Sequence, residues 1–475
     1  MKKKILPTLI FPLTLSMLAC APSAPSYKSA LEVGDDIELL NNVKFNNDKA
    51  VFDDFSGGVS YDNWIIANGF WGQGNGGVIS DNVFFTEEGE LLMRGNGLLY
   101  ARDEVKGVGT FKDGRNTGAA LISRFLCGPG RYEVKMKPLG RKGACTAFWT
   151  FSNQAVEGQE NDNHEIDIEL PGGKSSGVIS FKNLLNTNYV TETYMHSQDI
   201  STSVVGEEIY LNDGEYHTFG FDWYTNPGYI VYYLDGKVTG VSDHFIPSLQ
   251  TRLWLGVWFP NNAGFVGQSY FETDYLMVDW VKYIPFDDSQ AYTPFVPSLT
   301  VSETPEKLYP TIPTIVPETN LLANGDFEYI RRKENINDYG WVYNRLNTEE
   351  LPIEDVCYPE EGIGYQGTAG AVVKNGGYLT NDIDSVYEGF KYKLKFDGKS
   401  DGDDSVVLVS YFDSLNTRPI KEEYYYLDSH DYKHYEFDTT APEDSYFMRI
   451  EVYNNSTGSD TTMHVDNFKV VRIHD

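Results

Sequence analysis

The sequence has little positive charge, little cysteine and little helical periodicity, and each shortage excludes a class of protein. Only 38 of its 475 residues are Lys or Arg, against 69 Asp or Glu, so the formal net charge is -31. Nucleic acids and anionic membrane surfaces bind patches of Lys and Arg, and neither is therefore an expected partner. No stretch with a helical period is long enough to dominate the chain. These shortages favour a strand-built protein with a neutral partner.

Four cysteines are too few for a disulfide framework. Cys127 and Cys145 could pair, but a turn at residues 139–143 predicts a hairpin that places Cys145 opposite Lys137. We expect buried free thiols instead, because cysteine is among the most often buried residue types. The remaining two are Cys20 and Cys357.

The first residues are typical of an exported protein. Three lysines at positions 2–4 precede an apolar run over residues 5–18, which is too short to cross a bilayer. The run ends at Leu18, Ala19 and Cys20, which resembles a bacterial lipobox and implies cleavage before Cys20 and a lipid on its sulfur. Met17 departs from the usual opening Leu, so an ordinary signal peptide remains the alternative. We expect an exported protein anchored to the bacterial membrane or cell surface, with residues 21–42 as a tether.

The composition favours an all-β fold. Aromatic residues make up 14% of the chain, and Gly, Asn and Asp separate short strand-like runs at residues 83–85, 91–93, 119–122 and 132–136. Closely spaced strands without helical interludes predict an antiparallel sandwich. A chain of 475 residues predicts two or three domains.

One acidic strand dominates the chemistry of the sequence. Glu165, Asp167 and Glu169 alternate with Ile166 and Ile168. This is the period of a strand, which places the three acids on one face and the two isoleucines in a core. Crowded carboxylates raise at least one pKa, which keeps an acid protonated near neutral pH. A solvated strand face and a calcium site are the two alternatives.

The surroundings of this strand resemble glycoside hydrolase family 16. The segment at residues 165–169 matches that family's signature without a gap, and the similarity extends over residues 43–288. It includes the segments 128–138, 147–151, 216–223, 229–236 and 278–283. The resemblance implies a jelly roll, a concanavalin-like sandwich of two curved sheets, with the substrate on the concave face.

The same resemblance implies catalytic roles for the three acids. Glu165 would be the nucleophile, Glu169 the general acid/base and Asp167 the residue that tunes the nucleophile. Such chemistry requires no cofactor, and the sequence has no His/Cys cluster with metal spacing. The expected partner is a polysaccharide, and the protein is expected to be a monomer.

Flat aromatic side chains are expected beside the acids, because sugar rings present apolar faces. The candidates are Trp149, Trp223, Trp254 and Trp258. Trp254 and Trp258 are four residues apart on one predicted strand and should share a face. Asn183, on the next strand, could bind a sugar hydroxyl. His164 alternates to the opposite face and is expected to be structural.

The spacing within the acidic strand bears on the substrate. A single residue, Ile168, separates Asp167 from Glu169, so we expect a regular strand without a bulge. In the family this form is that of mixed-linkage glucanases and xyloglucan-active members. An endo-acting retaining β-glycanase acting on mixed-linkage β-1,3-1,4- or β-1,3-glucan is the leading hypothesis. The alternatives are a transglycosylase or endo-galactanase of the same family, and a polysaccharide-binding lipoprotein without activity.

A second module is expected after a spacer. Residues 289–319 are rich in Pro and Thr, which predicts an extended linker. The two ends of residues 320–475 resemble carbohydrate-binding modules of families 4 and 9, which implies a second β-sandwich and a possible structural calcium ion at Glu328 and Asp466. Its binding surface is expected to use two or three exposed aromatics from a larger set: Trp341, Tyr343, Tyr378, Tyr411, Tyr424, Tyr425 and Tyr426.

Overall fold

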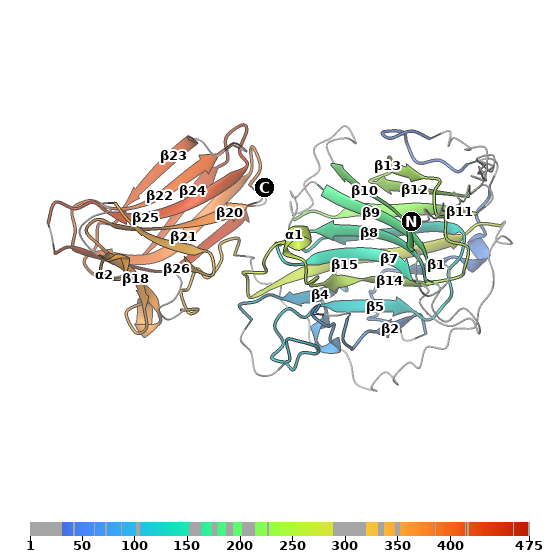
Figure 1. Ribbon diagram of the computed structural model, residues 1–475, viewed down its shortest axis with the longest axis horizontal. Coiled ribbons are helices and arrows are strands. Elements are labelled where there is room, and N and C mark those ends of the chain that lie inside the picture. Colours follow the sequence, from blue (N-terminus) through green and yellow to red (C-terminus); the bar gives the residue numbers. More distant parts are fainter. Residues whose placement is uncertain are drawn as a thin grey trace, which may run out of the picture.

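The computed structural model shows two β-sandwiches that follow one another along the chain (Figure 1). It describes residues 31–40, 43–60, 62–71, 74–86, 88–100, 105–151, 163–172, 178–186, 193–201, 214–225, 228–287, 320–330, 337–346, 352–384, 386–413, 415, 418–458 and 460–473. Cys20 and the proposed linker lie outside these residues. Among the described residues no helix has the length and apolarity needed to span a membrane.

The first sandwich consists of two antiparallel sheets. The eight-stranded sheet has the order β13-β12-β11-β6-β15-β4-β3, and β1 pairs with β15. Its strands are β1 (Val51–Asp53), β3 (Val83–Phe85), β4 (Leu91–Asn96), β6 (Gly130–Lys137), β11 (His217–Thr225), β12 (Gly228–Leu234), β13 (Lys237–Ser242) and β15 (Thr273–Pro285).

The seven-stranded sheet is seen face-on in Figure 1, with the order β10-β9-β8-β7-β14-β5-β2. Its strands are β2 (Trp64–Ile66), β5 (Ala119–Ser123), β7 (Cys145–Phe151), β8 (Asn163–Pro171), β9 (Val178–Asn186), β10 (Thr193–Ser201) and β14 (Arg252–Trp258). Short helices complete the unit: η1 (Asn47–Lys49), η2 (Ser80–Asn82) and α1 (Ala263–Val266).

The core of this unit follows from alternation along the strands. In β6 every second residue is buried, and Tyr132, Val134 and Met136 enter the same apolar cluster as Ile166 and Ile168 of the other sheet. Side chains from both sheets therefore fill one core, as in an aligned β-sandwich. The all-β prediction is confirmed.

The amino-terminal boundary differs from the prediction. Residues 31–40, expected in a tether, are part of the first sandwich, because Gly34 N donates to Val238 O and Ile37 N donates to Gly236 O, both at 2.8 Å. The segment packs against the outer surface of β11, β12 and β13 through an apolar cluster that includes Leu31, Ile37, Leu39, Leu40, Tyr224, Tyr229, Val231 and Val238. Burial of this apolar surface orders a segment that the sequence suggested was a spacer.

The second sandwich has a six-stranded and a five-stranded sheet around its own core. The six-stranded order is β16-β17-β20-β25-β22-β23 and the five-stranded order is β18-β19-β26-β21-β24. The strands are β16 (Asn337–Asp338), β17 (Trp341–Arg345), β18 (Cys357–Glu360), β19 (Gly370–Lys374), β20 (Gly377–Asp384), β21 (Lys391–Ser400), β22 (Ser405–Phe412), β23 (Pro419–Tyr426), β24 (Lys433–Thr440), β25 (Phe447–Asn454) and β26 (Thr462–Ile473), with the helices α2 (Ile353–Val356) and η4 (Tyr365–Gly367).

The cysteines are free and buried at positions 127, 145 and 357, as predicted. The predicted hairpin around Cys145 is wrong. Strands β6 and β7 are consecutive but belong to different sheets, and Cys145 is opposite Pro171 and Trp258 rather than Lys137. The turn at residues 139–143 therefore connects the two layers of the sandwich.

Candidate active site

Strand β8 presents the three acids on the face of the sheet that is turned away from the core. Ile166 and Ile168 are fully buried in the main core, whereas Glu165 and Glu169 are half-buried and Asp167 is 2% exposed. The pairings of β8 with β7 and β9 contain no register shift, so the predicted regular strand is confirmed. We name the surface that carries Glu165, Asp167 and Glu169 the acid face.

The register defines the neighbours of each acid. On β7, Phe151 is opposite Glu165, Trp149 is opposite Asp167 and Ala147 is opposite Glu169. Residues directly opposite in an antiparallel pair project to the same face. The β7 residues beside the three acids on the acid face are therefore apolar or aromatic. On β9 the residues in register with the three acids are Leu184, Lys182 and Ser180.

Three of the four predicted tryptophans lie on the acid face. Trp149 and Trp254 are paired across β7 and β14, and their rings stack at 5.4 Å with an interplanar angle of 27°. Trp258 packs against the same small cluster, which is separate from the main core. Trp254 and Trp258 therefore share a face, as their spacing predicts.

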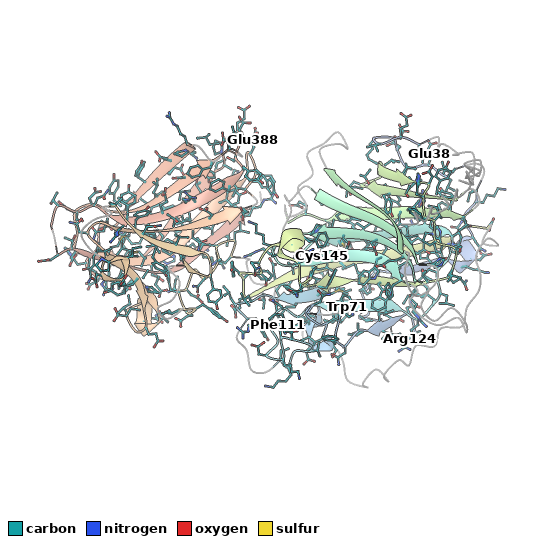
Figure 2. All side chains as sticks on the ribbon, viewed as in Figure 1. Glu38, Trp71, Phe111, Arg124, Cys145 and Glu388 are labelled. Carbon is teal, nitrogen blue, oxygen red and sulfur yellow. The ribbon has the colours of Figure 1, made fainter. Side chains whose placement is uncertain are left out.

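Trp71 is a fourth tryptophan of this face that the sequence did not single out. Its ring lies 5.7 Å from Trp149, 6.0 Å from Trp254 and 5.9 Å from Trp258, and Figure 2 shows it over this part of the sheet. The residue comes from the loop that follows β2, shortly before the glycine-rich stretch at residues 74–77. The available signal was the Phe70-Trp71 pair, two large aromatics in a loop otherwise built of small residues.

Two predicted substrate-binding residues are not placed on the acid face. Trp223 is fully buried in the main core, where its Nε1 donates to Pro247 O at 3.0 Å, so that prediction is wrong. It belongs to β11 of the other sheet, and its inward position fills the sandwich. Asn183 is in register with Ile166, not with an acid, and the side chains of β9 are outside the described part of the structure. The register therefore gives no support to Asn183 as a ligand of the sugar.

His164 has a structural role, as predicted. It is 3% exposed, and its Nδ1 accepts hydrogen bonds from Ser248 N at 2.9 Å and Leu249 N at 3.2 Å. These bonds require an unprotonated Nδ1 and attach β8 to the segment that precedes β14. His164 therefore helps to fix the strand that carries the acids.

The second sandwich buries three of its seven predicted binding aromatics. Trp341, Tyr343 and Tyr411 are in its core, where Trp341 stacks on Phe327 at 4.9 Å. Tyr425 is half-buried and stacks on Phe437 at 4.0 Å. Tyr378 is half-buried, and Tyr424 and Tyr426 are exposed. This agrees with the expectation of two or three accessible rings.

The predicted calcium ligands are already bound by protein donors. Glu328 Oε1 accepts from Ala369 N at 2.9 Å, and Asp466 Oδ2 accepts from Tyr365 N at 2.9 Å and Thr368 Oγ1 at 2.7 Å. Burial raises the pKa of Asp466 to about 6, and no group of three acidic, histidine or cysteine side chains within the described ranges could hold a metal ion. Calcium at this position remains a prediction.

Sequence comparison assigns the first sandwich to a family. Residues 81–281 match the profile of glycosyl hydrolases family 16. The chain is 30% identical over 232 residues to a β-glucanase of Paenibacillus macerans, covering 46% of this chain and 82% of that protein. It is 28% identical over 240 residues to a β-glucanase of Bacillus subtilis (strain 168), covering 48% and 87%.

Among solved structures, the chain is similar to a β-glucanase of Bacillus licheniformis, with 23% identity, a TM-score of 0.39, and coverage of 49% of this chain and 97% of that one. The family match spans the acid strand and ends within β15, before the second sandwich. On the family match and the 30% identity that extends over 82% of the Paenibacillus macerans β-glucanase, the chain belongs to glycosyl hydrolases family 16 and is a glycoside hydrolase.

Proposed function

We propose that the protein is an endo-acting retaining β-glycanase that hydrolyses a β-glucan. The observation that carries this proposal is the placement of three carboxylates on one face of a regular strand, beside an aromatic surface. The Cα atoms of Glu165 and Glu169 in such a strand are about 13 Å apart, and two inward-leaning Glu side chains bring the carboxyl groups to about 5 Å. This is the separation used for retention of configuration.

Each acid has a separate role in the proposed double displacement. Glu165 attacks the anomeric carbon while Glu169 gives its proton to the glycosidic oxygen, which releases one end of the chain and leaves a covalent glycosyl-enzyme. Glu169 then takes a proton from water, and that water displaces Glu165. Asp167 is nearly inaccessible to solvent and stands between them, which suits a residue that positions the nucleophile.

The four tryptophans provide the binding surface for the proposed substrate. Stacking of a sugar ring on an aromatic ring uses the apolar C–H face of a β-linked pyranose. Trp149 is only 9% exposed and is covered by Trp71 in an edge-on arrangement, so Trp71, Trp254 and Trp258 offer the accessible edges and faces.

Mixed-linkage β-1,3-1,4-glucan or β-1,3-glucan is the substrate that we propose. The regular acid strand supports a neutral glucan, and the curated relatives reported above carry the name β-glucanase. The test is incubation of the full-length protein with lichenan, laminarin, xyloglucan and galactans, with sizing of products and NMR of the first anomer released. A rapid fall in viscosity and a β-anomer support the proposal, whereas an α-anomer, or release of single sugars only, would contradict it.

The second sandwich is proposed to bind the same polysaccharide through a row of tyrosines. The register places Tyr378 opposite Tyr453, and both Tyr453 and Tyr426 opposite Val406, across β20, β25, β22 and β23. The alternate residues Leu379, Val452 and Val407 belong to the core, so the row lies on the outer face of the sheet. Tyr424 and Tyr426 alternate with Tyr425 on β23 and are both exposed, so Tyr424 shares the outer face with the row.

Replacing Tyr424 and Tyr426 together with Ala should weaken binding to β-glucan by about 30-fold, since each stacked ring is worth about 1 kcal/mol. Affinity electrophoresis in glucan gels measures this, with Glu165→Gln present in every protein to prevent digestion of the gel. Tyr446→Ala is the matched control, because Tyr446 is 51% exposed but lies outside the row. Equal retardation of the double variant and the control would rule out the row as the binding surface.

We also propose that the mature protein is anchored by a lipid on Cys20. In an expressing bacterium, metabolic labelling with an alkynyl fatty acid should tag the wild-type protein and leave Cys20→Ala untagged and released from the membrane fraction. Cys127→Ala is the control, because that thiol is buried in the first sandwich. A wild-type protein that carries no label would favour an ordinary signal peptide.

A further inference from the structure

The two sandwiches contact each other through a small set of polar and aromatic residues. Arg141 Nη1 donates to the carbonyl oxygen of Asn320 at 2.7 Å, and Lys142 forms an ion pair with Asp384. Tyr329 OH donates to Leu99 O, and the rings of Tyr270 and Tyr339 lie 5.8 Å apart, edge to face. We name these residues the docking surface: Leu99, Arg141, Lys142 and Tyr270 of the first sandwich, with Asn320, Tyr329, Tyr339 and Asp384 of the second.

Arg141 and its partner Asn320 are each held in place by contacts within their own sandwich. Its side chain is only 14% exposed, it lies 3.7 Å from Asp274, and its guanidinium lies 5.0 Å from the centroid of the Phe271 ring. Its partner Asn320 is equally fixed, because Asn320 Oδ1 accepts from Val470 N and its Nδ2 donates to Phe468 O, both at 2.9 Å. The hydrogen bond thus joins two ordered groups, so little side-chain entropy is lost on docking.

Charge on the two sides is complementary. Lys142 of the first sandwich pairs with Asp384 of the second, whereas Arg141 is balanced by Asp274 of its own sandwich and donates to a neutral carbonyl oxygen. Arg115 is likewise paired within the first sandwich. A hydrogen bond and ion pair with Asp113 raise its pKa. Opposite charges at such a boundary favour one orientation over others.

The docking surface is connected to the acid strand. Arg141 and Lys142 belong to the turn between β6 and β7, and Gly172, directly after β8, donates its N–H to Ala144 O of that turn at 3.0 Å. Figure 2 labels Cys145 at the end of the sheet that faces the second sandwich, and Cys145 is opposite Pro171 and Trp258. The second sandwich is therefore next to the end of the acid face that carries Glu169.

We infer that the two sandwiches are held together as one body through the docking surface, and do not move independently on the Pro-rich linker. The linker keeps the second sandwich at millimolar effective concentration, so even a modest contact energy keeps the surface closed. If the tyrosine row binds polysaccharide, as proposed above, its position relative to the acids is then constant, and one polymer chain can be presented to both.

Small-angle X-ray scattering of the full-length protein tests this inference without any substrate. We expect the wild type to give a single compact distance distribution that is unchanged by protein concentration. A Pro-rich spacer of about 30 residues can span up to about 90 Å when extended, so opening the surface should raise the maximum dimension by at least about 20–30 Å. Arg141→Glu with Lys142→Glu should show this increase.

Two further variants show whether an increase in dimension comes from opening of the docking surface or from misfolding. Asp384 is exposed on the second sandwich, and Asp384→Lys places a positive charge opposite Lys142. This variant should also open the docking surface. Lys44→Glu with Lys49→Glu makes the same charge reversal at exposed positions beside β1 and should stay compact. An extended wild type, or compact distributions for both interface variants, would overturn the inference.

Discussion

Replacing Glu165 with Gln is expected to lower kcat on β-glucan by about 10⁴-fold or more, because the amide retains the shape of the side chain but cannot form the glycosyl-enzyme. The fold should not change, since Glu165 is half-buried on the outer face of β8 and makes no contribution to the main core. Steady-state hydrolysis of soluble glucan measures the loss, and circular dichroism checks the fold. Glu88→Gln is the matched control, because Glu88 is exposed and lies away from the acid face.

The Glu169→Ala variant distinguishes the proposed acid/base role of Glu169 from the proposed nucleophile role of Glu165. A substrate with a good leaving group needs no proton, so formation of the glycosyl-enzyme should continue, and hydrolysis of that intermediate should become slow. Azide needs no general base, and adding it should restore turnover and yield a glycosyl azide. If both Glu165→Gln and Glu169→Ala retain activity within a few fold of wild type, the acid face is not the catalytic site.

Replacing Arg131 with Met should reduce the free energy of unfolding by about 3–5 kcal/mol, because it leaves a buried carboxylate without its cation. Arg131 Nε and Nη2 donate to the two oxygens of Asp222 at 2.7 and 2.8 Å, and Asp222 is completely buried. The amino-terminal segment covers this pair, since the ring of Phe45 lies 5.2 Å from the guanidinium and Leu40 N donates to Tyr224, which in turn donates to Asp222. Urea unfolding measures the loss.

The stability of Arg131→Met should depend on pH, because this variant leaves the buried carboxyl group of Asp222 without its cation. Burial raises the pKa of Asp222, although hydrogen bonds from Arg131 oppose the rise. Without Arg131 the folded protein holds the carboxyl proton more tightly than the unfolded chain does. Protonation of Asp222 therefore stabilises the folded variant at low pH. This stabilisation is lost as the pH rises through the pKa that Asp222 has in the folded state. The deficit of Arg131→Met should therefore be smaller at pH 5 than at pH 8.

Two variants distinguish a lost ion pair from a general packing defect. Arg131→Met combined with Asp222→Leu removes both charges and should recover at least half of the lost stability. Lys135→Met, on the same strand, breaks an exposed pair with Asp279 and should cost less than about 1 kcal/mol. A double variant no more stable than the single one would mean that the charge pair is not the cause.

Predictions made within one strand agree with the structure. The alternation of acids and isoleucines in β8 placed Glu165, Asp167 and Glu169 on one face, and the spacing of Trp254 and Trp258 placed both on a common face. These predictions depend only on the period of two along a strand, which the backbone imposes on any extended segment. His164, alternating with the acids, was correctly expected on the other face.

Predictions that required knowledge of a neighbouring strand were less successful. Trp223 was assigned to substrate binding from its residue type, but its strand belongs to the other sheet and its inward face fills the core. Asn183 is one position out of register with the acids. Cys145 was assigned to a hairpin that the chain does not form, because the turn before it crosses between sheets. A shift of one residue, or a change of sheet, reverses the face on which a residue lies.

The sequence by itself determined the strand-rich class, the regular acid strand and the shortage of positive charge. All of these follow from residues close together along the chain, or from composition. Only the tertiary structure decided that Trp71 joins the acid face, that residues 31–40 cover the outer sheet, and that the basic turn carrying Arg141 and Lys142 contacts Asn320 and Asp384. Those arrangements depend on contacts between residues far apart in the chain, and their energies come from burial and charge pairing that exist only after the sheets have assembled.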